Sequence, residues 1–157
     1  MKRALACLGL CLGLAGCAST RVETSGPADR PLCRAGVSAL VVWEPKWRPD
    51  QEDAAEREAA AQRGIERFFS DSRCFARTEI RRNDDRVLEL TADRLVAIRV
   101  RELGTEVVLE VKMLDARTGQ MLADLRTHLQ HDGPAVMKGV GTLEDDMQAA
   151  LAAVLTF

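Results

Sequence analysis

Alternating and continuous apolar stretches divide most of the chain into strands and helices. Residues 37–43 are nearly all apolar and rich in β-branched side chains, which predicts a strand covered on both faces. Residues 95–101, 106–114 and 121–129 alternate between apolar and polar positions, as strands with one buried face do. The turn-forming residues 115–119 join the last two of these segments, which therefore predict a β-hairpin.

Three other segments have the apolar spacing or the capping residues of helices. Residues 50–70 open with Asp50 and Asp53, which resemble a capping box, and then repeat apolar residues along one stripe. Residues 84–91 predict a short helix with Val87, Leu88 and Leu90 turned inward. Residues 142–157 predict a last helix that begins with a threonine cap.

These elements together predict an α/β (α+β) fold. Residues 74–81 alternate weakly and predict an edge strand. The sheet is then single and mixed, with about five strands, and the long helix, the short helix and the C-terminal helix pack on it. Residues 36–157 are sufficient for one domain with its own hydrophobic core.

The first residues follow the pattern of a secretory signal. Lys2 and Arg3 precede an apolar stretch over residues 4–14, which is too short to cross a bilayer as a helix. The sequence Leu14-Ala15-Gly16-Cys17 then resembles the lipobox of bacterial lipoproteins. We therefore expect residues 1–16 to be a lipoprotein signal peptide, with a cleaved signal and a coincidental cysteine as the alternative.

The lipobox resemblance implies where the protein works. Cys17 would carry a diacylglyceryl group and, after cleavage, an acylated amino group, and several acyl chains anchor a protein stably. Ala18 follows it, where lipoproteins kept in the inner membrane often carry Asp, so we expect the outer membrane, facing the periplasm. The outer leaflet of the inner membrane is the alternative. Residues 17–35, rich in Ser, Thr, Gly and Pro, predict a lipidated amino terminus and flexible tether.

Charge and aromatic content argue against nucleic acid as a partner. The chain has 22 basic and 24 acidic residues, and loss of Lys2 and Arg3 with the signal leaves 20 basic residues and a formal charge of −4. The chain contains no Tyr, and aromatic residues are few, so a platform for stacking bases is not expected. Basic residues are not concentrated in one segment beyond Arg81-Arg82.

Two cysteines remain when the signal and the acylated Cys17 are set aside. In an oxidising compartment Cys33 and Cys74 are most simply a structural disulfide, which closes a loop of about 40 residues. Two free thiols or a redox pair are the alternatives, although the chain lacks a Cys-x-x-Cys motif.

The order of elements resembles a group of periplasmic domains. The segment Ala92-Asp93-Arg94-Leu95-Val96-Ala97-Ile98-Arg99-Val100 and the hairpin turn Leu114-Asp115-Ala116-Arg117-Thr118-Gly119 carry the likeness. The group comprises the curli-secretion lipoprotein, the lipoprotein activators of penicillin-binding proteins, and the N-terminal domain of the Tol-system propeller protein. The resemblance spans about residues 36–156 and implies a binding module without catalysis.

No constellation of residues specifies a reaction, a cofactor or a metal. His128 and His131 stand three apart in a predicted strand, which places them on opposite faces, and we interpret them as surface histidines. The acidic pairs Asp84-Asp85 and Asp145-Asp146 are explained by a loop and by a helix start. The chain also lacks the nucleophile-elbow and phosphate-loop motifs.

The segment from Trp43 to Pro49 is the candidate binding site. Trp and Arg are favoured interface anchors, and two prolines stiffen this loop, so Lys46, Trp47 and Arg48 are candidates for contact with a partner. In the alternative interpretation, Trp47 folds back over the start of the helix. We expect a non-enzymatic adaptor that contacts another envelope protein, with an accessory subunit of a transport or secretion complex and a periplasmic enzyme as alternatives.

Overall fold

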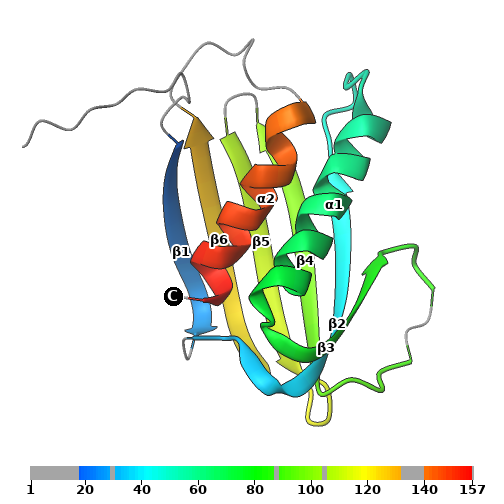
Figure 1. Ribbon diagram of the computed structural model, residues 1–157, viewed down its shortest axis with the longest axis vertical. Helices are drawn as coiled ribbons and strands as arrows, with labels where there is room; N and C mark the ends of the chain where they lie inside the picture. The colour runs from blue at the N-terminus through cyan, green and yellow to red at the C-terminus, as the bar shows by residue number, and fades with distance from the viewer. Residues whose placement is uncertain (1–17, 29–30, 87–88, 104–105, 132–139, 157) are drawn as a thin grey trace, which may run out of the picture.

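The computed structural model describes residues 18–28, 31–86, 89–103, 106–131 and 140–156. The elements follow one another as β1 (Ala18–Ala28), β2 (Arg34–Lys46), α1 (Ala54–Ser72), β3 (Phe75–Arg82), β4 (Arg94–Leu103), β5 (Glu106–Asp115), β6 (Met121–His131) and α2 (Val140–Leu155) (Figure 1). Neither helix is long and apolar enough, over the residues that the structure describes, to cross a membrane.

All six described strands form one mixed sheet in the order β1-β6-β5-β4-β2-β3. The pairs β1–β6, β6–β5 and β5–β4 are antiparallel, which confirms the predicted hairpin of β5 and β6. The pairs β4–β2 and β2–β3 are parallel, and β3 lies at the edge as its weak alternation predicts. The mixed α/β class is confirmed, with six strands and two helices where the sequence predicts about five strands and three helices.

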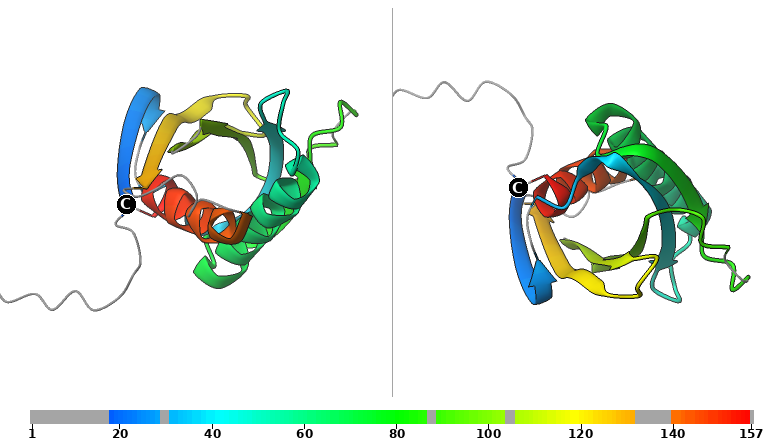
Figure 2. Two further views of the ribbon diagram at one scale, coloured as in Figure 1. Left: turned by 90° about the horizontal axis from the view of Figure 1, so that it is seen from above. Right: turned by 90° about the horizontal axis from the view of Figure 1, so that it is seen from below.

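Both helices lie on the same face of the curved sheet (Figure 2). The core forms between the helices and the sheet, from apolar side chains that alternate along the strands and recur along the helices. Its largest fully buried members are Trp43, Ile65, Ile98, Leu109, Met113, Leu125, Leu129, Met147, Leu151, Leu155, Val41 and Val96. The two helices also contact each other, and Glu144 of α2 lies 3.1 Å from Arg63 and 2.9 Å from Arg67 of α1.

The helix starts differ from the predicted ones. Helix α1 begins after Asp53, whose carboxylate makes no capping hydrogen bond because it accepts from the Arg57 side chain (2.7 Å) and from Gln51. The predicted capping box with Asp50 is therefore wrong. Helix α2 begins at Val140, so Thr142 lies within its first turn and is not its cap.

Two further segments differ from the sequence prediction. Ala18–Ala28, predicted as part of the tether over residues 17–35, forms edge strand β1, and Val22 packs against the core. The predicted short helix is absent from residues 84–86 and 89–91, and Leu90 is 46% exposed where it was expected to point inward. Val87 and Leu88 lie outside the described residues.

Asp93 ties three segments together at one end of the sheet. Its Oδ2 accepts hydrogen bonds from the backbone N–H (3.0 Å) and the hydroxyl (3.1 Å) of Ser38, at the start of the buried part of β2. Its Oδ1 accepts from Arg117 Nη2 (2.9 Å) in the hairpin turn. These interactions, that of the Ser38 backbone first, hold the pKa of Asp93 below its usual 3.8, so the carboxylate is charged at neutral pH.

Candidate partner-binding surface

The face of the sheet opposite to the helices is covered by no described helix or strand (Figure 2). Side chains that point away from the core line this open face. At one level of the strand register they form a charge row across five neighbouring strands: Glu23 (β1), Arg126 (β6), Glu110 (β5), Arg99 (β4) and Glu44 (β2). Signs alternate along the row, so each acidic residue is flanked by a basic one.

Ion pairs connect most of the charge row. Glu110 accepts from Arg126 Nη2 at 2.8 Å and from Arg99 Nη1 at 3.4 Å. Arg99 Nε donates to Glu44 Oε1 at 2.7 Å. The hydrogen bond from Arg99 is the main reason that the pKa of Glu44 lies below its usual 4.5, and the same contact raises the pKa of Arg99. The row is therefore charged yet locally balanced, which suits specific docking of a polar surface more than capture of one charged ligand.

The described surface has several hollows, and the one on the open face is too small for an ordinary ligand. One of about 150 Å³ lies on the open face beside Val42 and Lys112, and it is smaller than the roughly 300–1,000 Å³ of ordinary ligand sites. A wider one of about 460 Å³ lies between α1 and the ends of β2 and β3. Its polar side chains bond one another: Trp43 donates to Gln62, and Arg82 pairs with Glu58.

The predicted binding residues lie at the end of β2 and just beyond it. Lys46 is exposed, and its Nζ lies 3.4 Å from Glu44 Oε2. Arg48 is half exposed, and its Nε lies 3.6 Å from Asp50 Oδ1. Trp47 packs partly against the core, and its Nε1 is buried with no hydrogen-bond partner among the residues that the structure describes. No hydrogen bond or ion pair of the described residues joins these three side chains to one another. The exposed part of the candidate site is thus the pair of cations, with Trp47 between them as a support.

His128 connects three strands through the open face. Its Nδ1 lies 2.5 Å from Glu106 of β5, and its Nε2 lies 3.3 Å from Glu23 of β1. Within the described part of the chain no three His, Cys, Asp or Glu side chains gather in a way that could hold a metal ion. His131 ends β6, and its side chain is outside the described set. The contacts of His128 could not be predicted from the sequence, because they depend on the pairing of strands far apart in the chain.

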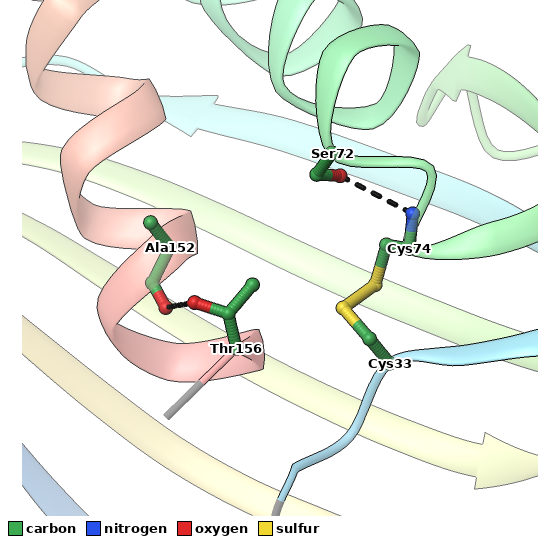
Figure 3. Close-up of a disulfide and its surroundings, with 5 residues drawn as sticks. All are labelled: Cys33, Ser72, Cys74, Ala152 and Thr156. Carbon is green, nitrogen blue, oxygen red and sulfur yellow. Dashed lines mark hydrogen bonds between the residues drawn. A yellow bond between two sulfur atoms is a disulfide. The ribbon is translucent and has the colours of Figure 1, made fainter.

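The predicted disulfide is present and joins the residues that precede two neighbouring strands. Cys33 precedes β2, Cys74 precedes β3, and their Cα atoms are 4.6 Å apart (Figure 3). Cys74 also donates its backbone N–H to Ser72 Oγ at 3.3 Å, at the end of α1. The bridge therefore fixes the end of the crossover that brings β3 beside β2. Cys17 lies outside the described residues, one peptide bond before the start of β1.

Comparison with known proteins finds likeness in structure. No protein-family model and no curated protein sequence matches the chain. The chain is similar in structure to PelC from Paraburkholderia phytofirmans, crystallised as a dodecamer, with 15% sequence identity and a TM-score of 0.52. The match covers 89% of this chain and 98% of the PelC chain. A second crystal form of PelC gives the same identity and TM-score and covers 90% of this chain and 99% of the PelC chain. Lipoprotein GNA1162 from Neisseria meningitidis is 17% identical, and the match covers 74% of this chain and 95% of GNA1162 (TM-score 0.37). TolB from Acinetobacter baumannii is 10% identical, and the match covers 88% of this chain and 31% of TolB (TM-score 0.31).

The likeness to PelC is extensive. It spans nearly the whole of both chains, so it includes the sheet and both helices. At 15% identity a shared structure is evidence of a shared fold. This chain is therefore similar in fold to PelC.

Proposed function

We propose that the protein is a lipid-anchored, non-enzymatic binding domain of the bacterial cell envelope. Acylation of Cys17 would hold it at the outer membrane, facing the periplasm, with the outer leaflet of the inner membrane as the alternative. The signal pattern supports the anchor, and the Cys33–Cys74 disulfide suits an oxidising compartment.

The observation that carries a binding role is the open face of the sheet. Charged side chains there are ordered by ion pairs between strands, as in the 2.7 Å contact of Arg99 with Glu44, and they offer a pre-organised polar surface. Lys46 and Arg48 extend this surface at the end of β2. The partner best suited to an open surface with only a small hollow is another protein, and no catalytic step is assigned to the domain.

A second form of this function is a subunit of an envelope transport or secretion complex. PelC, to which the chain is similar in fold, was crystallised as a dodecamer. A repeated assembly of this chain would present many copies of the open face together, and a partner would then bind by avidity. Stoichiometric co-purification with membrane proteins distinguishes this form from a monomeric adaptor.

Photo-crosslinking at single positions tests the binding role in intact cells. A benzophenone amino acid replaces Arg48 in one variant and Arg117, in the hairpin turn at the other end of the sheet, in the matched control. We expect one discrete adduct with an envelope protein from position 48 and none from position 117. No adduct from position 48, or the same adducts from both positions, would contradict the proposed site.

Alanine substitutions separate binding from folding. Because Lys46 and Arg48 are exposed, the double variant Lys46→Ala with Arg48→Ala is expected to leave thermal unfolding unchanged. The same variant should lose the adduct that forms when the benzophenone amino acid is placed at another exposed position of the same loop. Trp47→Ala is expected to lower stability, since this side chain packs against the core. An equal loss of stability in both variants would show that the loop is structural only.

A further inference from the structure

The sheet has two open edges, and they lie at opposite sides of the domain. Strand β1 pairs only with β6, and strand β3 pairs only with β2, among the strands that the structure describes. Each therefore presents a row of unpaired backbone N–H and C=O groups, which can template another strand. We propose that these edges bind each other between copies of this chain, so that β1 of one copy extends the sheet of the next at β3.

The usable length of the two edges is the same. Strand β3 has eight residues, Phe75–Arg82. Strand β1 is regular from its start to Thr24, and the register shifts between Thr24 and Ala28, where Gly26 and Pro27 interrupt the edge. Because proline and a bulge end strand pairing, the edge open to a neighbour is about residues 18–25, which matches β3 in length.

The faces of the two edges agree. On β1, Glu23 contacts His128 on the open face, so Arg21 lies on that face as well. On β3, Arg82 pairs with Glu58 of α1 and so points toward the helices. The alternating residues Arg77, Glu79 and Arg81 therefore point to the open face, where their charges alternate as those of Arg21 and Glu23 do.

Charge selects one antiparallel register between the edges. With Arg21 opposite Glu79, Glu23 comes opposite Arg77, and both cross-strand pairs have opposite signs. A shift by two residues in one direction places Arg21 opposite Arg77. A shift by two residues in the other direction places Arg21 opposite Arg81 and Glu23 opposite Glu79. Like charges directly opposite each other destabilise a strand pair, so the first of these three registers is favoured.

The selected register also aligns the residues that point toward the helices. Val22 then faces Thr78, and Thr20 faces Ile80, so uncharged and mostly β-branched side chains meet there. Residues 18–25 lie alongside residues 75–82 over their whole length. In the single chain these charges form ion pairs within each strand: Arg21 Nη2 lies 3.1 Å from Glu23 Oε1, and Arg81 Nη2 lies 2.6 Å from Glu79 Oε1. These exposed pairs are weak and can exchange for partners on a neighbouring strand.

The antiparallel choice follows from the membrane anchor, and this step rests on the proposed function. Copies anchored in one bilayer through Cys17 point in the same direction. Within a copy β1 runs opposite to β6 and β4, and β2 and β3 run parallel to β4, so β1 and β3 run in opposite directions. Neighbours turned about the membrane normal thus bring β1 and β3 together antiparallel. The contact is head-to-tail, which generates a closed ring or an open array.

Sedimentation of the unlipidated mature chain tests the interface apart from the anchor. The protein is residues 17–157 with Cys17→Ser, secreted behind a cleavable signal, and its mass is measured by analytical ultracentrifugation from about 1 to 100 µM. We expect concentration-dependent association. A chain that remains monomeric throughout would overturn the proposal, and a failure of Cys17 acylation in cells would refute the anchor and leave this result unaffected.

A charge exchange identifies the surface. Glu23→Arg and Arg77→Glu, made singly, each place like charges opposite each other and should weaken association about tenfold, and the double variant should restore it. Arg117→Glu, in the hairpin turn, is the matched control and should leave association unchanged. Circular dichroism checks that each variant folds. Unchanged association in both single variants, or no restoration in the double variant, would overturn the β1–β3 interface.

Engineered cysteines test the register without relying on charge. Arg21→Cys with Glu79→Cys should yield disulfide-linked multimers in air, because directly opposite Cβ atoms lie about 4.5–5.5 Å apart. Arg21→Cys with Arg81→Cys, one repeat further along β3, should yield far fewer. Equal crosslinking of the two pairs, or of neither, would contradict the register.

Discussion

Replacing Gly64 with alanine tests how closely α1 and α2 approach each other. A Cβ atom at this position would lie 2.5 Å from the backbone oxygen of Glu144 and 2.6 Å from the Cβ of Met147. Carbon atoms in contact are normally about 3.5–4.0 Å apart, so the helices would have to separate by about 1 Å. Met147 is fully buried, and its surroundings have little room to yield.

The expected net effect of Gly64→Ala is destabilisation. Overpacking a core costs about 1–3 kcal/mol. Alanine in a helix interior recovers up to about 1 kcal/mol relative to glycine. We therefore expect a loss of about 1–2 kcal/mol, which lowers the melting temperature by about 4–8 °C in a domain of this size.

Thermal and urea unfolding followed by circular dichroism measure this loss. Gly36→Ala is the matched control, because a Cβ there meets nothing within 4 Å. It should leave stability unchanged or raise it slightly. A Gly64→Ala variant as stable as the wild type would refute the close approach of the two helices, since helix propensity alone predicts a gain.

Two further predictions concern the bridge and the end of the sheet. Cys33→Ser with Cys74→Ser opens a loop of 41 residues and should cost about 4 kcal/mol, measured by urea unfolding under oxidising conditions; an unchanged midpoint would contradict a stabilising role. Because Ser38 and Arg117 hold the pKa of Asp93 below its usual 3.8, the stability that this carboxylate contributes is present at neutral pH and is lost as the pH falls through the lowered value. Asp93→Asn should therefore unfold at lower urea than wild type at pH 7, with little difference at about pH 2; a constant difference at both pH values would exclude the linkage.

Hydrophobic alternation was enough to predict the central strands. Residues 106–114 and 121–129 gave the hairpin, and the apolar stretch over 37–43 gave the buried strand, because each places most of its apolar side chains in the core. The disulfide followed from the expected compartment and the count of cysteines. These features depend on composition and local pattern, which a single sequence contains.

Features that depend on pairing were not predictable. Strand β1 exposes most of its side chains at an edge, so its Ser, Thr, Gly and Pro residues resemble a linker, and its described contacts with the core come from Val22 and Ala28. The polar faces of β4 and β5 were evident, yet the contact of Arg99 with Glu44 required the parallel register of β4 with β2. Asp53 is a further case, since its pairing with Arg57 competes with the capping role that its position suggests.

The amino-terminal residue of the mature protein is the most direct test of the lipid anchor. Mass spectrometry of the N-terminal peptide, from protein extracted from the bacterial envelope, measures both the cleavage site and the modification. We expect a peptide that begins at Cys17, with a diacylglyceryl group on its sulfur and an acyl chain on its amino group. A mature chain that begins at another residue with a free amino group, recovered in the soluble fraction, would contradict it.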